Sequence, residues 1–226
     1  MWHGCRRPCC VLRPAGNATI PTVIEPPALL MPHPDPGSII AATRRWLERA
    51  VIGLNLCPFA KAVHVKQQVR YVVTAAQDAD GLLAELAHEL DTLVQADPEQ
   101  IDTTLLIHPQ AMVDFLDYHF FLAEADALLR RMRLEGTIQI ASLHPGYEFA
   151  GSAPDDVTNY TNRAPYPTLH LLREASIDRA VAAFPDAASI FEKNIETLRR
   201  LGHAGWAALW RDPTPRPPEP EDEPND

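Results

Sequence analysis

Residues 143–174 read LHPGYEFAGSAPDDVTNYTNRAPYPTLHLLRE, a stretch that joins two expected β-strands through a loop far longer than such a connection requires. Connections in compact domains are usually short, whereas long loops held on a rigid scaffold often carry function. The side chains here that bind or react are His144, Tyr147, Glu148, Asp155, Asp156, Asn159, Tyr160, Asn162, Arg163, Tyr166 and His170. We therefore expect a functional site on this loop and on the strand ends beside it.

On either side of this loop, strand-like and helix-like segments alternate. Alternating apolar side chains and chain-stopping prolines predict strands at residues 65–75, 103–108, 137–144 and 168–173. Helices are expected after Ser38, after Asp78 or Asp80, over residues 111–134, after Ser176 and over 186–201. The first three strands, separated by helices, imply parallel crossovers, and the fourth follows a loop, which allows it to run antiparallel to the third. The predicted fold class is α/β, with a mixed sheet of about four strands and flanking helices.

Length and composition favour one domain with tails. The chain has 226 residues, of which 46% are hydrophobic, which is ample for one core. We expect a disordered N-terminal extension over residues 1–37, a single α/β domain over 38–211, and a disordered acidic, proline-rich tail over 212–226.

The net charge of −10 argues against partners that require a basic face. Nucleic acid and anionic membrane surfaces are therefore not expected to bind this protein. No apolar run approaches the roughly 18–20 residues of a membrane span, and no secretory signal is evident. Cys5, Cys9 and Cys10 crowd the first ten residues and Cys57 stands alone, a usage typical of a reduced, cytoplasmic protein.

Three histidines suggest a metal site. His108 and His144 each end a strand before a proline, and His170 lies in the fourth strand near the end to which the loop returns. Parallel strands would bring the first two to one rim of the sheet, where ligands of open α/β folds collect. With Glu148, Asp155 or Asp156 nearby, the three imidazoles would suit zinc or non-haem iron. The alternative is that each histidine only satisfies backbone groups at its strand end.

Cys57 offers a second mechanism. Pro58 forces Cys57 out of helical geometry, so the thiol would lie at a turn and could act as a nucleophile if a histidine lowered its pKa. The alternative is that Cys57 is a small buried apolar residue.

Polar residues within the loop form a third candidate group. The guanidinium of Arg163 matches carboxylate or phosphate, and Asn159, Asn162 and Tyr166 could orient a bound substrate. Asp155 or Asp156 would act as base or ligand beside them. The alternative is that Arg163 pairs with these aspartates to order its own loop, while the asparagines form turns.

Several long motifs in order resemble a known family: RRWLERAVIGLNLCPFAK, DTTLLIHP, FLDY, QIASLHPGYEFAG, DDVTNYTNRAPYPTLHLLREASIDRA and IETLRRLG. The chain resembles the family called domain of unknown function 1415, which occurs in proteobacteria and in some plants and algae. The resemblance covers roughly Ser38–Arg211. The family has no assigned activity, so the resemblance implies where a site lies but transfers no catalytic role.

These observations favour a cytoplasmic enzyme that acts on a small anionic metabolite. His108, His144 and His170 would be metal ligands or acid–base groups, with Arg163 as the substrate anchor and Cys57 as a reserve nucleophile. The alternative is a non-catalytic module that binds a ligand or partner through the 145–167 loop.

Overall fold

The computed structural model describes residues 34–183 and 189–211, and the two expected tails lie almost entirely outside these ranges. The elements, in chain order, are α1 (Pro36–Trp46), the π-helix η2 (Leu47–Ile52), α2 (Ala60–Val65), β1 (Val69–Val73), α3 (Ala79–Gln95), β2 (Thr103–Ile107), α4 (Phe115–Arg131), β3 (Ile138–Leu143), the 3-10 helix η3 (Val157–Thr161), β4 (Thr168–Arg173), α5 (Glu174–Ala183) and α6 (Ile190–Ala208). In the described ranges, no helix is long and apolar enough to cross a membrane.

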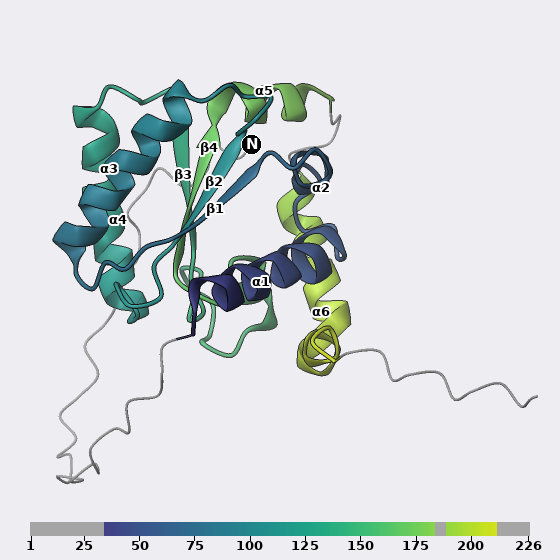
Figure 1. Ribbon diagram of the computed structural model, residues 1–226. Helices are drawn as coiled ribbons and strands as arrows, with labels where there is room; N and C mark the ends of the chain where they lie inside the picture. The colour runs from purple at the N-terminus through teal and green to yellow at the C-terminus, as the bar shows by residue number, and fades with distance from the viewer. Residues whose placement is uncertain (1–33, 184–188, 212–226) are drawn as a thin grey trace, which may run out of the picture.

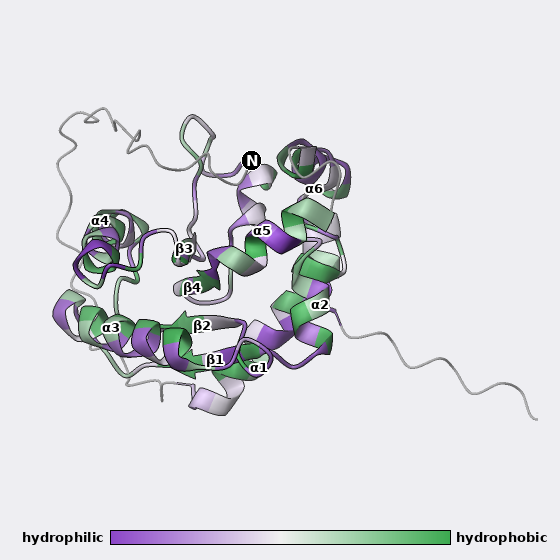
Figure 2. Cartoon of the chain, turned by 90° about the horizontal axis from the view of Figure 1, so that it is seen from above, coloured by the Kyte–Doolittle hydropathy of each residue, from purple (hydrophilic) through white to green (hydrophobic). Residues whose placement is uncertain are grey.

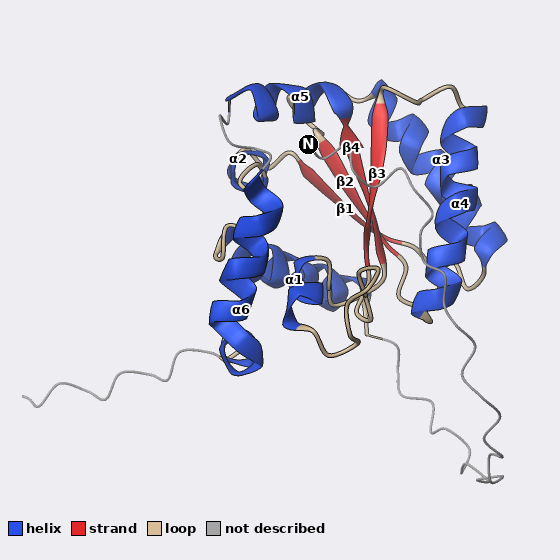
Figure 3. Ribbon diagram, turned by 180° about the vertical axis from the view of Figure 1, so that it is seen from behind, coloured by secondary structure: helices blue, strands red, loops and turns tan. Residues whose placement is uncertain are grey.

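The four strands form one mixed sheet in the order β1-β2-β4-β3, which confirms the predicted fold class (Figure 1). β1 and β2 are parallel, and β4 lies antiparallel between β2 and β3. β1, β2 and β3 therefore all point toward the same end of the sheet. The long loop lies at that end, beside α1 (Figures 1 and 3).

Each face of the sheet is covered by a separate hydrophobic cluster. Seen from above, α3 and α4 lie on one side of the strands, and the remaining helices lie on the other (Figure 2). Leu106, Leu169 and Leu171 pack under α3 and α4, whereas Leu105 and Ile107 pack under α1 and η2. Because side chains alternate along a strand, each residue of the sheet is assigned to one cluster by its position.

Local signals set most helix boundaries. Asp78, one of the two predicted N-caps, begins α3: its carboxylate accepts a hydrogen bond from the Gly81 amide at 2.8 Å. Asp35, and not Ser38, caps α1: its carboxylate accepts from the Ser38 amide at 3.1 Å. The helix expected from residue 111 begins at Phe115, because Asp114 caps it and Met112 has a positive φ of 52°.

The C-terminal helix bends at a glycine. Gly202 has φ 63° inside α6, a conformation that costs glycine little and other residues much more. Beyond the bend, Trp206 stacks on Tyr160 of η3 with ring centroids 4.6 Å apart. Trp206, Leu209 and Trp210 pack against the cluster under α1, which confirms the prediction that this end of the chain returns to the body.

Candidate functional site

The ends of β2 and β3 place His108 and His144 at one rim of the sheet and on its α4 side. Tyr118 of α4 stacks against both imidazoles, at centroid distances of 5.6 Å from His108 and 5.1 Å from His144. The Tyr118 hydroxyl donates to the Thr168 carbonyl at 2.9 Å and accepts from the Leu143 amide at 3.1 Å. This aromatic group therefore ties α4 to the centre and the edge of the sheet.

Most of the nitrogens of these two rings contact backbone groups. His108 Nδ1 donates to the Ala111 carbonyl at 2.8 Å, which leaves Nε2 as a buried lone pair with no partner among the described residues. His144 Nδ1 accepts from the Gly146 amide at 3.0 Å, and its Nε2 lies 3.3 Å from the Met112 carbonyl. Burial lowers the pKa of His108 to about 4 and also lowers the pKa of His144. Both rings are therefore neutral at pH 7.

His170 lies on the opposite face of the sheet. It is paired with Leu105 of β2 and Ala141 of β3, on the side that faces α1. Its Nε2 lies 2.7 Å from Thr103 Oγ1. The sheet itself separates His170 from His108 and His144, so the expectation that the three histidines converge on one ion is wrong. Among the residues of 34–183 and 189–211, no three His, Cys, Asp or Glu side chains are grouped closely enough to hold a metal ion.

The asparagines of the loop are bonded to the loop and to the adjacent strand β3. Asn159 is fully buried: its Oδ1 accepts from the Phe149 amide at 3.0 Å and from Ser152 Oγ at 2.7 Å, and its Nδ2 donates to the Ala153 carbonyl at 2.8 Å. Asn162 Nδ2 donates to the Ser142 carbonyl at 3.2 Å. The Asn159 contacts match the turn-forming alternative and make Asn159 the centre of the loop's fold, whereas the Asn162 side chain ties the loop to β3.

Arg163 also acts within the loop. Its Nε donates to the Tyr147 carbonyl at 3.0 Å, and one terminal nitrogen donates to the Pro154 carbonyl at 2.6 Å. The guanidinium carbon lies 5.0 Å from the centre of the Tyr160 ring. The arginine thus orders the loop as the alternative reading expects, although carbonyl oxygens replace the expected aspartates.

The other predicted loop residues lie apart from any common site. Asp156 caps η3 by accepting from the amide and hydroxyl of Thr158, both at 2.8 Å, and these bonds lower the pKa of its carboxyl. Asp155 is exposed. Tyr166 packs against the cluster under α1.

Cys57 follows η2 and is partly buried against the same cluster. Burial raises the pKa of its thiol, which favours the protonated form at pH 7. This environment weighs against the reserve role as a nucleophile and matches the apolar alternative.

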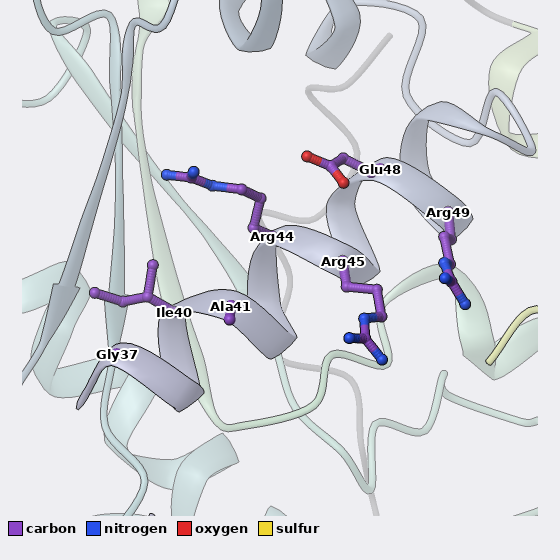
Figure 4. A pocket seen from close by; sticks show the side chains of 7 residues that line it. All are labelled: Gly37, Ile40, Ala41, Arg44, Arg45, Glu48 and Arg49. Atoms are coloured by element: carbon purple, nitrogen blue, oxygen red, sulfur yellow. The ribbon is translucent and has the colours of Figure 1, made fainter. Parts of the chain in front are cut away.

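A pocket that the sequence did not indicate lies along α1 and the start of η2 (Figure 4). Its volume is about 390 Å³, and its lining is Gly37, Ile40, Ala41, Arg44, Arg45, Glu48 and Arg49. Three arginines against one glutamate give this lining a positive charge, on a chain whose net charge is −10. Exposed arginines on a helix usually read as a solvated face, so their spacing alone gave no signal.

The arginines of the pocket differ in how firmly they are held. Arg44 extends toward the sheet, with its guanidinium carbon 5.2 Å from the centre of the Tyr71 ring (Figure 4). Arg49 donates to the Leu209 carbonyl at 2.9 Å. Arg45 makes no hydrogen bond or ion pair with any described residue, and it points away from the sheet (Figure 4).

The π-helix gives this region an unusual backbone. The amides of Gly53 and Leu56 bond to the carbonyls of Glu48 and Val51, five residues earlier in each case. Such helices are rare and are found frequently at functional sites. Two polar atoms buried near the junction, Trp46 Nε1 and Tyr71 Oη, have no hydrogen-bond partner in the described part of the chain.

Residues 38–208 match the family described as "Protein of unknown function (DUF1415)". The chain belongs to this family. No curated protein and no solved structure matches it.

The DUF1415 region contains both groups of residues. His108, His144 and the long loop lie within residues 38–208, as do Arg44, Arg45, Glu48 and Arg49 of the pocket. The carbonyls of Leu209 and Arg211, to which Arg49 donates, lie just beyond the matched range.

Proposed function

We propose that this DUF1415 protein is a ligand-binding module for a small anionic metabolite, which binds in the pocket along α1 and η2. The observation that carries the proposal is a pocket of about 390 Å³ that is lined by three arginines at the start of a π-helix. Pockets for small molecules generally range from about 300 to 1,000 Å³. The pocket is therefore of a size for one metabolite.

The charge of the lining supports an anion as ligand. A guanidinium presents up to five donors in a planar fork that matches carboxylate and phosphate oxygens. Arg44 and Arg49 are positioned by Tyr71 and the Leu209 carbonyl, whereas the forked donors of Arg45 are free to turn toward a ligand. Glu48 Oε1 lies 3.5 Å from His64 Nε2 of α2, so this carboxylate has a neighbour outside the pocket.

Binding, and not turnover, is what this lining supports. Its described residues supply mainly hydrogen-bond donors and positive charge, with Glu48 as the single candidate nucleophile or base in the lining. Of the predicted catalytic residues, His144 and Asp156 are hydrogen-bonded to backbone groups, Asp155 is exposed, and Cys57 is partly buried.

Isothermal titration of the full chain at low salt tests the proposal, with inorganic phosphate, citrate and AMP as probes. We expect one of these anions to bind, and the affinity to fall as salt screens the arginines. Arg45→Ala should weaken binding by about tenfold or more, since a hydrogen bond to a charged group contributes about 1.5–3 kcal/mol.

Arg131→Ala is the matched control, because Arg131 is an exposed arginine in the last turn of α4, on the other side of the sheet. It should leave the affinity unchanged. If the two variants weaken binding equally, or if none of the three anions binds, the proposal is wrong.

A further inference from the structure

The three histidines that the sequence singled out differ in what their rings leave available. His108 has a free Nε2, but the residue is 0% exposed and no solvent reaches it. His144 uses both nitrogens on backbone groups. His170 uses one nitrogen, makes no hydrogen bond through Nδ1 with any described residue, and keeps part of its surface accessible. Of these three residues, His170 combines a nitrogen that has no hydrogen bond to a described residue with a partly exposed surface.

Thr103 fixes which nitrogen of His170 carries the proton. The Thr103 hydroxyl donates to the Leu171 carbonyl at 2.7 Å, so its proton is not available to the imidazole. It must then accept at the contact of 2.7 Å with His170, and this contact places the proton on Nε2. Nδ1 is left as an acceptor with a lone pair. The hydrogen bond to Thr103 also limits rotation of the ring, so the direction of that lone pair is set by the sheet.

The strand neighbours of His170 carry no charge and leave part of the residue's surface exposed. In the sheet it is flanked by Leu105 and Ala141, and Ala141 on the edge strand β3 has only a methyl group beside the imidazole. Burial lowers the pKa of His170 to about 4, so the ring is neutral at pH 7. A neutral acceptor between two apolar neighbours suits a hydroxyl or amide N–H group better than an anion.

We propose that His170 Nδ1 is the hydrogen-bond acceptor of a second binding site, on the α1 side of the sheet, for an uncharged ligand with a hydroxyl or amide N–H group. The site is independent of the arginine pocket, because neither His170 nor Thr103 lines that pocket. His170 binds the ligand, and Thr103 is the positioning residue that holds the ring in its acceptor tautomer.

Accessibility is tested first, on the unmodified full chain. Diethyl pyrocarbonate acylates neutral imidazoles, and peptide mass spectrometry measures each site separately. We expect His170 to react at least roughly tenfold faster than His108, because a sealed ring reacts only when the structure opens locally. Exposed His88 on α3 gives the rate of an unprotected imidazole. Equal rates for His170 and His108 would overturn the proposal.

Ligand chemistry is tested with acetamide as the probe. In long-range ¹H–¹⁵N spectra, we expect acetamide to shift the Nδ1 resonance of His170 saturably and to leave that of His88 unchanged. His170→Gln keeps a side-chain donor that can reach Thr103 but has no acceptor at the Nδ1 position. It should retain the thermal midpoint and lose at least about tenfold in acetamide affinity. Absence of a saturable shift, or unchanged affinity in a folded His170→Gln variant, would refute the site.

Discussion

The loop after β3 and the pocket along α1 are both rich in polar side chains, but they use them differently. In the loop, Asn159, Asn162 and Arg163 are bonded to backbone atoms of the loop or of the adjacent strand. In the pocket, Arg45 has no partner among the described residues. The density of reactive residue types therefore does not locate a binding site. What matters is which of their hydrogen-bonding atoms remain available after folding.

The largest effect should follow from removing Asn159. Asn159→Ala removes the buried side chain that accepts from the Phe149 amide and donates to the Ala153 carbonyl, while the Ser152 hydroxyl keeps the Phe149 carbonyl as its partner. We expect a loss of about 3–5 kcal/mol in the free energy of unfolding, measured by urea denaturation. Anion binding in the pocket should persist under conditions where the variant is folded. If Asn159→Ala instead changed the stability little and abolished anion binding, the contrast drawn between the loop and the pocket would be wrong.

Acid should destabilise the rim through His108. Its pKa is about 4 in the folded chain against an ordinary value of 6.5, so the unfolded state binds the proton more readily. Stability is therefore fully present above about pH 6.5 and is lost as the pH falls toward 4, by an amount on the order of 3 kcal/mol. Urea denaturation at several pH values measures how steeply the free energy of unfolding changes with pH. This dependence should be shallower in His108→Asn.

His88→Gln is the control for this titration, because His88 is exposed on α3. Its slope should match that of the unmodified chain. If His108→Asn keeps the full slope, other groups cause the acid sensitivity and His108 is not a sealed neutral ring.

A smaller change should distinguish charge from geometry in the pocket. Arg45→Lys keeps the positive charge and removes the planar fork, so we expect the affinity for the bound anion to fall by about three- to tenfold. Titration calorimetry against Arg45→Ala makes the comparison. Equal losses in the two variants would mean that the fork itself is required, whereas no loss in Arg45→Lys would mean that charge suffices.

The smallest effect is expected at an exposed position of the loop. Asp155→Asn should change the free energy of unfolding by no more than about 0.5 kcal/mol, since Asp155 is exposed and makes no hydrogen bond among the described residues. The measurement is the same urea denaturation as for Asn159→Ala. A loss comparable with that variant would show that the loop depends on its charges as much as on its buried amide.

Most of the fold could be predicted from the sequence because it is encoded locally. Alternation and prolines marked the four strands, and Asp78 marked the start of α3, whereas η3 with its Asp156 cap was not predicted. α2 was missed because its six residues are too short to show a period, and the π-helix was missed because its residues continue the helical pattern of α1. Both depend on contacts that periodicity does not report.

The expectation that the three histidines converge was wrong for a reason that the sequence alone could not reveal. Leu169 and Leu171 on one face of β4 and Thr168 on the other are all buried, so the pattern of apolar residues does not show which cluster His170 faces. The register of β4 with β2 and β3 determines which face of the sheet carries His170. The orphan nitrogen of His108 and the available arginine at position 45 likewise emerge only when every hydrogen bond is assigned.

The position of β4 in the sheet has a consequence for biosynthesis. Of the four described strands, β4 is made last, yet it lies between β2 and β3. Neither of those strands therefore has its neighbour on that side until residue 173 leaves the ribosome. Chain growth of about 5–20 residues per second places at least roughly one second between the completion of β3 and that of β4. During this interval the open edges of β2 and β3 can pair with other chains. A nascent chain stalled within the long loop should therefore need a chaperone more than one stalled after β4.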